Sequence, residues 1–409
     1  MKVLISGTAG SGGWPSPDCG CASCARVAPG RRATSVILDV SVAADGRPPL
    51  GDLAAPGTSM ASDSPAAPGG SATPDAPRTP TRPMPLSDPV RLPFSGPLSG
   101  PLPAGYRASP GPDGLTVTTP GGRRVLYAAS SPSSPPPYGE SSRGGSPYGE
   151  RGEPTLDLVL LDVLDRPERL GDLRRRGLVG ERTHVVAVDV DHRVPTEAEL
   201  ARRAALWGVR VVPDGTVVDT GEPPPAPAPP PRRTLLLGGS RSGKSAEAEL
   251  RLAAEPEVLY VATGPSGDGD PEWLRRVREH RDRRPAHWDT AETTGLSEVL
   301  RSAGTPLLID GLGTWVAAVF DECDAWPGEA GGGASAMEAV AARCDDLVAA
   351  WRQTRSRVVA VSDEVGLGLV PDTAGGRMFR DTLGRLNQRL ALESEDVTLV
   401  VSGRLLPLL

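Results

Sequence analysis

Gly238-Gly239-Ser240-Arg241-Ser242-Gly243-Lys244-Ser245 is the stretch that decides the fold of the second half of this chain. It reads G-x-x-x-x-G-K-S, the pattern of the phosphate-binding loop of P-loop nucleotide enzymes. An apolar run at 234–237 precedes it and predicts a short buried strand, and strong helix formers fill 246–253. Strand, glycine-rich loop and helix in this order predict a site for nucleotide phosphates.

The residue types in this loop suit that chemistry. Gly238 and Gly243 let the backbone turn so that its N–H groups point inward, and the helix N-terminus adds partial positive charge under the phosphates. Lys244 would reach the β- and γ-phosphates, and the Ser245 hydroxyl would hold Mg²⁺. A chance glycine-rich turn is the alternative in a chain with 49 glycines. The flanking strand and helix favour the P-loop.

Length and composition limit the classes of protein to which this chain can belong. A chain of 409 residues predicts two or three domains, and 45 prolines, 49 glycines and 4% aromatic residues predict that part of it is disordered. The net charge of −7 gives no basic footprint for nucleic acid. No apolar run approaches the roughly 20 residues of a membrane span. We therefore expect neither a nucleic-acid partner nor a membrane span.

Cysteine usage and the first residues indicate the compartment. Residues 1–7 read as a short strand broken by glycine, not as a signal peptide. The five cysteines are an odd number with three clustered, which argues against a disulfide framework. Both features predict a cytoplasmic protein.

The first half of the chain is interrupted by low-complexity sequence. Segments at about 48–112 and 130–152 are rich in Pro, Ser, Ala and Gly, and they predict mobile insertions because they cannot bury enough apolar surface. Between them, two short apolar runs flank a Pro-Gly-Gly turn and predict a hairpin at 115–118 and 124–127. Further on we expect strands at 156–164 and 185–190, and a helix at 195–207 with Thr196 as its N-cap.

A proline-rich run at 222–232 divides the chain into domains at 1–221 and 233–409, because such a run favours stiff, extended backbone. After it, apolar strands alternate with helical segments. This order predicts an α/β fold of P-loop type, with a mostly parallel sheet covered by helices on both faces. We expect strands at 234–238, 258–263, 306–310, 357–362 and 397–402, and helices at 244–254, 271–284, 295–303, 336–354 and 375–393.

Two further features carry chemistry in this domain. Asp310 ends an apolar run, and a carboxylate at the C-terminal end of a strand can hold Mg²⁺ through water. His280 lies among arginines in the segment 276–288. A neutral imidazole can attack the α-phosphorus of a nucleotide while arginines stabilise the transferring group. Taken alone, this segment reads better as a solvated basic helix face.

Five motifs in order resemble one family. The P-loop is followed by Leu-Tyr-Val-Ala-Thr at 259–263 and by the basic segment at 276–288. Asp-Glu-Val-Gly-Leu-Gly-Leu-Val-Pro comes at 363–371, and Phe-Arg-Asp-Thr-Leu-Gly-Arg-Leu-Asn-Gln-Arg-Leu-Ala at 379–391. Together they resemble the bifunctional adenosylcobinamide kinase/adenosylcobinamide-phosphate guanylyltransferase family of cobalamin biosynthesis. The resemblance covers about 233–409.

The resemblance implies two reactions on one protein. ATP or GTP phosphorylates the aminopropanol hydroxyl of adenosylcobinamide. GTP then guanylylates a histidine, which passes GMP to the cobinamide phosphate. His280 matches that histidine, Lys244 and Ser245 match the P-loop positions, and Asp310 matches the acidic strand end, so Ser245 and Asp310 would hold Mg²⁺ with the nucleotide. The nucleotide-binding residues implied are Gly238, Gly239, Ser240, Arg241, Ser242, Gly243, Lys244, Ser245, Ala262, Thr263, Gly264, Arg281, Arg284, Glu292 and Asp310. The resemblance also suggests a homo-oligomer.

Three stretches depart from the family pattern. Asp363 stands where Asn is usual, and its charge would weaken nucleotide binding if it lies near the phosphates. Residues 311–315 read Gly-Leu-Gly-Thr-Trp where Leu-Thr-x-Trp is usual, and 324–336 add a glycine-rich loop. None of these changes removes a proposed catalytic group.

Cys19, Cys21 and Cys24 form a C-x-C-x₂-C cluster, and three thiolates this close can hold Zn²⁺ with a fourth ligand from elsewhere. Three free thiols that bind no metal are the alternative. With the glycines at 7–13 before it, the segment resembles the start of phosphodiesterase-type metallo-β-lactamase-fold proteins, some of which carry a structural zinc. That resemblance implies His192 as the fourth ligand.

The same resemblance predicts a degenerate domain that is catalytically silent. The metal centre of that fold needs an H-x-H-x-D-H cluster, and none of the four histidines, at 184, 192, 280 and 287, forms one. Asp189 occupies the position expected for a late metal-binding histidine.

Other functions stay open at this point. The P-loop domain could be a kinase only, with a structural His280, or a scaffold that binds nucleotide without turnover. His287 is the rival of His280, but its neighbours Ala286 and Trp288 indicate packing. We interpret Asn387 and Gln388 as helix–sheet or subunit contacts.

Overall fold

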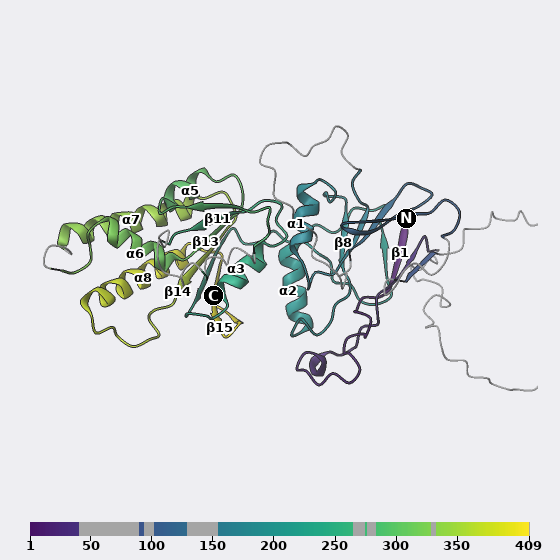
Figure 1. The fold of residues 1–409 in the computed structure, drawn as a ribbon, viewed down its shortest axis with the longest axis horizontal. Coiled ribbons are helices and arrows are strands. Elements are labelled where there is room, and N and C mark those ends of the chain that lie inside the picture. Colours follow the sequence, from purple (N-terminus) through teal and green to yellow (C-terminus); the bar gives the residue numbers. More distant parts are fainter. Residues whose placement is uncertain are drawn as a thin grey trace, which may run out of the picture.

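The computed structural model describes residues 1–40, 90–93, 102–128, 154–264, 275, 284–328 and 333–408. An N-terminal unit and a C-terminal unit lie side by side (Figure 1) and meet through helices α2 (Glu197–Trp207) and α3 (Lys244–Leu252). The proline-rich residues 222–232 are largely exposed. The linker therefore runs over the surface while the two units contact each other directly.

The C-terminal unit is built on a seven-stranded sheet in the order β12-β11-β13-β14-β10-β15-β16. All neighbours in it pair in parallel except β15 and β16, which are antiparallel. The five expected strands are confirmed, and β12 and β16 add one strand at each edge. The bounds are β10 (Arg233–Gly238), β11 (Leu259–Ala262), β12 (Asp289–Glu292), β13 (Leu307–Asp310), β14 (Val358–Asp363), β15 (Asp396–Val401) and β16 (Arg404–Pro407).

Helices cover both faces of this sheet, as the sequence predicts. Leu236 of β10 packs in one apolar cluster with Ala248 and Leu252 of α3. Leu235 and Leu237, which point to the opposite face because side chains alternate along a strand, join the cluster of the other helices. Those helices are α5 (Leu296–Ser302), α6 (Leu312–Glu322), α7 (Ala334–Gln353) and α8 (Ala374–Leu392). The helix expected at 271–284 lies mostly outside the described residues.

The N-terminal unit consists of two sheets that pack face to face. Val3 and Ile5 of the first sheet share one buried cluster with Leu158 and Leu160 of the second. The first sheet has the order β3-β2-β1-β9, from β1 (Lys2–Gly7), β2 (Ser35–Leu38), β3 (Val90–Pro93) and β9 (Thr216–Asp219). The second has the order β4-β5-β6-β7-β8, from β4 (Arg107–Gly111), β5 (Gly114–Thr118), β6 (Arg124–Ala128), β7 (Leu158–Leu161) and β8 (His184–Ala187).

Two helices cover the outer face of the second sheet. Leu170 of α1 (Glu168–Arg175) and Leu200 of α2 join Val159 and Leu161 of β7 in a separate cluster. Thr196 caps α2 as predicted, since its side chain accepts a hydrogen bond from the Glu199 N–H at 3.1 Å. Among the described residues, no helix is long and apolar enough to cross a membrane.

Strands β3 and β4 correct the prediction of one mobile insertion at 48–112. Both strands fall inside that segment, β3 pairing with β2 and β4 with β5. Each lies at the edge of its sheet, where pairing on one side orders a sequence whose composition predicts a loop. Pro110 is compatible with β4 because an edge strand tolerates a residue that has no backbone N–H to donate. The segment 130–152 lies outside the described residues.

Candidate active site

The P-loop connects β10 to α3, and its glycines are required by geometry. A Cβ on Gly238 would stand 2.6 Å from the carbonyl oxygen of Val400, so a side chain there would collide with β15. Gly243 has a φ of 98°, in the left-handed region that glycine tolerates best, and α3 starts directly after it. Gly239, Ser240 and Arg241 are exposed along the rest of the loop. The N–H groups at the start of α3 therefore face the open side of the loop.

Two side chains of the loop are arranged to receive an anion. The Ser242 hydroxyl is buried and has no hydrogen-bond partner among the described residues. Lys244 folds back over the loop, where Nζ donates to the carbonyl oxygen of Gly239 at 3.0 Å and pairs with Asp363 Oδ1 at 2.9 Å. A phosphate chain in the loop would offer both residues an acceptor.

Ser245 and Asp310 meet beside the loop. The Ser245 hydroxyl donates to Asp310 Oδ1 at 3.0 Å, and the other carboxylate oxygen accepts from the Tyr260 hydroxyl at 2.6 Å. Burial, followed by the charge of Asp310, raises the pKa of Tyr260 far above its ordinary value, so this hydroxyl remains a donor. Hydroxyl and carboxylate oxygens are the hard ligands that Mg²⁺ prefers, so the pair fits the predicted ion.

The remaining predicted positions lie along the same edge of the sheet. Ala262 pairs with both Asp310 and Glu292 in register, which brings the carboxyl ends of three strands together. Thr263 follows directly, and its hydroxyl donates to the carbonyl oxygen of Gly311 at 2.6 Å. Gly264 comes next in the chain. Ligands of open parallel sheets bind outside these carboxyl ends, as the sequence predicts here.

The basic segment is described only at its end. His280 and Arg281 lie outside the described residues. Arg284 lies over the ring of Tyr260, with 3.6 Å between its guanidinium carbon and the ring centroid, so it stands next to Asp310. His287 contacts the carbonyl oxygen of Glu255 at 3.4 Å. Glu255 follows the C-terminal end of α3, whereas Lys244 lies at the N-terminal end of that helix.

Sequence reasoning missed Tyr260 as a site residue. It was visible only as an apolar member of a strand. A buried tyrosine hydroxyl needs a hydrogen-bond partner. Asp310, at the end of the neighbouring strand β13, provides one. The pairing of a strand tyrosine with an acidic strand end is the signal that could have identified Tyr260.

Asn387 makes the helix–sheet contact that the sequence predicts. It lies on α8, accepts from the Ser362 hydroxyl at 2.6 Å, and donates to the carbonyl oxygen of Asp363 at 3.0 Å. It therefore holds the end of β14 next to the loop.

The ion pair between Asp363 and Lys244 predicts that this carboxylate opposes nucleotide binding. Replacing it with Asn, the residue usual in the family, should tighten nucleotide binding about fivefold, the factor that corresponds to about 1 kcal/mol for a partly exposed ion pair. Titration of a fluorescent nucleotide into wild type and Asp363→Asn measures this, with Asp372→Asn as an exposed control on the next loop. Equal affinities would show that the ion pair does not oppose binding.

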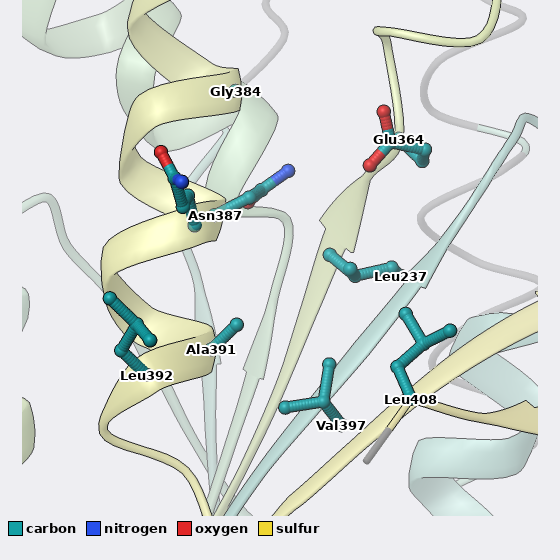
Figure 2. A pocket seen from close by; sticks show the side chains of 9 residues that line it. Leu237, Glu364, Gly384, Asn387, Ala391, Leu392, Val397 and Leu408 are labelled. Atoms are coloured by element: carbon teal, nitrogen blue, oxygen red, sulfur yellow. The ribbon is translucent and has the colours of Figure 1, made fainter.

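A groove of about 360 Å³ opens between α8 and the strands beside it (Figure 2). Its apolar lining comes from Leu237, Ala391, Val397 and others, and Asn387 and Gln388 add amide groups. Glu364 stands at the end near the P-loop, where its N–H donates to the carbonyl oxygen of Gly238 at 3.1 Å.

The predicted cysteine cluster assembles in the N-terminal unit. One ligand atom each from Cys19, Cys21, Cys24 and His192 lies within 4.8 Å of all the others. His192 Nδ1 is 3.7 Å from the sulfur of Cys19 and 3.9 Å from that of Cys24. A hydrogen bond from the Cys24 N–H lowers the pKa of Cys21, which favours the thiolate. Three sulfurs and one imidazole at these separations fit a tetrahedral zinc site.

Asp189, which the sequence resemblance aligns with a late metal-binding histidine, is hydrogen-bonded by protein groups. The Tyr127 hydroxyl donates to its Oδ2 at 2.6 Å. Next to it, Arg193 pairs with the buried Asp162 at 2.9 Å. The Arg193 guanidinium therefore neutralises the charge of the Asp162 carboxylate.

These geometries define an α/β unit with a P-loop nucleotide site at the carboxyl edge of its sheet. The family described as "Cobinamide kinase / cobinamide phosphate guanyltransferase" matches residues 234–408. The chain is 39% identical over 180 residues to the bifunctional adenosylcobalamin biosynthesis protein CobU of Salmonella typhimurium, over 41% of this chain and 95% of that protein. It is 42% identical over 184 residues to CobP of Pseudomonas aeruginosa, which carries the same description, over 43% of this chain and 96% of that protein.

The chain therefore belongs to the cobinamide kinase/cobinamide phosphate guanylyltransferase family, and it is an enzyme that combines a kinase with a nucleotidyltransferase. Among solved structures, an ATPase of a bacterial type III secretion system is similar with a TM-score of 0.26 and 14% identity, over 41% of this chain and 50% of that one.

Proposed function

We propose that the P-loop edge of the C-terminal unit carries out both reactions of the family on adenosylcobinamide. The observation that supports this most is the grouping of Lys244, Ser245 and Asp310 at one strand edge. A purely structural turn has no need of a lysine, a hydroxyl and a carboxylate converging there.

In the first reaction the aminopropanol hydroxyl oxygen attacks the γ-phosphorus of ATP or GTP. The new O–P bond forms as the bond to the β-phosphate oxygen breaks, and nucleoside diphosphate leaves. Lys244 moves from Asp363 to the phosphates and balances the charge that develops on them. Ser245 and Asp310 would hold Mg²⁺, which neutralises charge on the phosphate oxygens when bound.

In the second reaction a ring nitrogen of His280 attacks the α-phosphorus of GTP, and pyrophosphate leaves. A phosphate oxygen of adenosylcobinamide phosphate then attacks the same phosphorus, and the N–P bond breaks to release histidine. Arg281 and Arg284 stabilise the transferring group. The position of Arg284 beside Tyr260 and Asp310 supports this role.

Product analysis tests this proposal. Full-length protein with adenosylcobinamide, ATP, GTP and Mg²⁺ should yield adenosylcobinamide phosphate and then adenosyl-GDP-cobinamide, identified by mass. Phosphate transfer without the GDP product would leave a kinase. Nucleotide binding without either product would leave a non-catalytic scaffold.

We propose that the N-terminal unit is a degenerate metallo-β-lactamase-like domain (1–221) without catalysis, linked by 222–232 to the enzyme domain (233–409). The engagement of Asp189 by Tyr127 and of Asp162 by Arg193 supports this, because these carboxylates already have protein partners. The cysteine cluster would hold a structural Zn²⁺.

Zinc content tests the metal proposal. Wild-type protein should carry about one zinc per chain, and Cys24→Ser should lose it, because a tetrahedral structural site rarely tolerates a missing thiolate. Elemental analysis after desalting measures this, with Cys323→Ser, a cysteine of the other unit, as the matched control. Wild-type protein that stays metal-free after refolding with zinc would refute the site.

We also propose a homo-oligomer and a cytoplasmic location. Leu392 and Leu408 on the rim of the groove are 81% and 41% exposed, which a second copy of the chain would cover. All five cysteines are free thiols, as expected in a reducing compartment.

A further inference from the structure

The two units share an apolar contact at the C-terminal end of the P-loop helix α3. Ala254 is 3% exposed and belongs to the buried cluster of the N-terminal unit, with Leu250 packed against the same cluster. Gly171 of α1 comes so close that a Cβ there would stand 2.5 Å from the carbonyl oxygen of Glu255. The N-terminal unit therefore touches the helix that presents Lys244 at its other end.

Donors from the N-terminal unit satisfy carbonyl groups at this end of α3. The indole N–H of Trp207 donates to the carbonyl oxygen of Leu250 at 2.7 Å. Arg174 donates to the carbonyl oxygens of Ala254 at 2.8 Å and of Trp207 at 2.7 Å. The Leu250 carbonyl also accepts from the Ala253 N–H at 3.3 Å, so the bonds from Trp207 and Arg174 add to the local one and hold this end of the helix.

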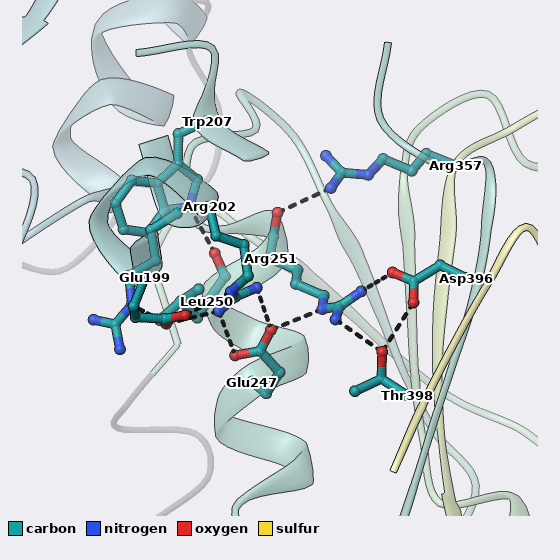
Figure 3. A network of polar contacts seen from close by, with 10 residues as sticks. Glu199, Arg202, Trp207, Glu247, Leu250, Arg251, Arg357, Asp396 and Thr398 are labelled. Carbon is teal, nitrogen blue, oxygen red and sulfur yellow. Dashed lines mark hydrogen bonds and ion pairs between the residues drawn. The ribbon is translucent and has the colours of Figure 1, made fainter. Parts of the chain in front are cut away.

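An ion-pair network joins α2 to the first half of α3 (Figure 3). Arg202 donates to both carboxylate oxygens of Glu247, at 2.9 and 3.2 Å. Arg251, one turn further along α3, donates to the same carboxylate at 2.8 Å and also pairs with Asp396 on β15. The network thus runs from α2 through α3 to the sheet.

The centre of the network is buried, while Arg202 at its outer end is 28% exposed. The side chains of Glu247 and Arg251 are 10% and 6% exposed. Arg202 is also held on its own helix by Glu199, at 2.7 and 2.9 Å. Burial alone would lower the pKa of Arg202, but the bonds to Glu199 and Glu247 outweigh it and raise the pKa above its ordinary value. Removing one partner from such a pair leaves a poorly compensated charge.

Glu247 lies three residues after Lys244, so one helical turn separates the network from the lysine and hydroxyl of the nucleotide site. The curated relatives match this chain over 95% and 96% of their own lengths but over only 41% and 43% of this one. The supporting unit therefore lies outside the region shared with them.

We propose that the N-terminal unit is a fixed support for the P-loop helix and that Arg202 is the positioning residue that couples it to the nucleotide site. This inference rests on the proposed nucleotide binding at that site. Arg202 acts through Glu247 on the placement of α3, and through α3 on Lys244 and Ser245.

Four full-length variants test the coupling: two single variants, the double variant that combines them, and a control. Arg202→Met keeps the length of the side chain without its charge, and Glu247→Gln removes the partner. Arg203→Met is the matched control, because Arg203 pairs with Glu199 on the same helix. The readouts are the affinity for a fluorescent GTP analogue with Mg²⁺, and amide hydrogen exchange in α3.

Arg202→Met should weaken binding by about tenfold, within the range common for coupled sites, and should speed exchange in α3. Glu247→Gln should weaken binding at least as much, because it also removes the pair with Arg251, and the double variant should be no weaker than Glu247→Gln alone, since Arg202→Met breaks a link that this variant already lacks. Arg203→Met should behave as wild type. Unchanged affinity and exchange in Arg202→Met, or additive effects in the double variant, would overturn the proposal.

The test separates this proposal from the proposed reactions. Wild-type protein that binds the analogue but forms no GDP-cobinamide would refute the reactions while leaving the coupling measurable. If Arg202→Met unfolds the N-terminal unit, fast exchange in β1 reveals it, and Glu247→Gln then carries the test.

Discussion

Replacing Lys244 with Met should lower both phosphate transfer and guanylyl transfer by at least about 10²-fold, the usual effect of removing one charge-stabilising donor. The fold should survive, because this side chain contacts only loop and Asp363 atoms in the interactions described. The two rates, measured separately with adenosylcobinamide and with adenosylcobinamide phosphate, check the expectation.

The chain offers a clean control for this experiment. It contains only two lysines, Lys2 and Lys244, against 42 arginines. Lys2 lies on β1 in the other unit and is exposed, so Lys2→Met should leave both rates unchanged. Lys244→Arg adds a second comparison, because the planar guanidinium does not replace a compact ammonium in the loop. A Lys244→Met enzyme that retains either rate would refute a shared P-loop site.

Replacing His280 with Ala should abolish guanylyl transfer and leave phosphorylation of adenosylcobinamide near the wild-type rate. Only the second reaction needs a nitrogen nucleophile, and the arginines of the basic segment do not supply one because they stay protonated. Product formation from adenosylcobinamide phosphate and GTP measures the loss.

His287→Ala is the matched control for that variant. It lies seven residues further on and contacts the carbonyl oxygen of Glu255, away from Lys244. Burial lowers the pKa of His287, which favours the neutral imidazole, and its loss should cost only packing and the contact to Glu255. Loss of transfer in His287→Ala with activity retained in His280→Ala would exchange the two roles.

The P-loop and its sheet could be predicted because local signals and the global fold agree there. The glycine pattern, the apolar strands and the acidic strand end all indicate one architecture, and the structure brings Lys244, Ser245 and Asp310 together. The cysteine cluster was predictable for a related reason, since three of its four ligands are neighbours in sequence.

Other elements depend on contacts that sequence does not reveal. The edge strand β12 reads Asp-Thr-Ala-Glu and forms through pairing with β11 rather than through its own preference. Helix α6 opens with Leu-Gly-Thr, which reads as a loop, yet its buried Trp315, Val319 and Phe320 hold it against the sheet. The link from Arg202 to Glu247 spans 45 residues, and each partner alone resembles a surface charge.

The most direct test of the two-reaction account is transfer of label from α-³²P-GTP to the protein. Wild-type enzyme with Mg²⁺ should retain acid-labile label on a denaturing gel, and His280→Ala should retain none. Label that persists in His280→Ala, or a wild type that binds GTP and takes up no label, would contradict the guanylyl-histidine on which the second reaction depends.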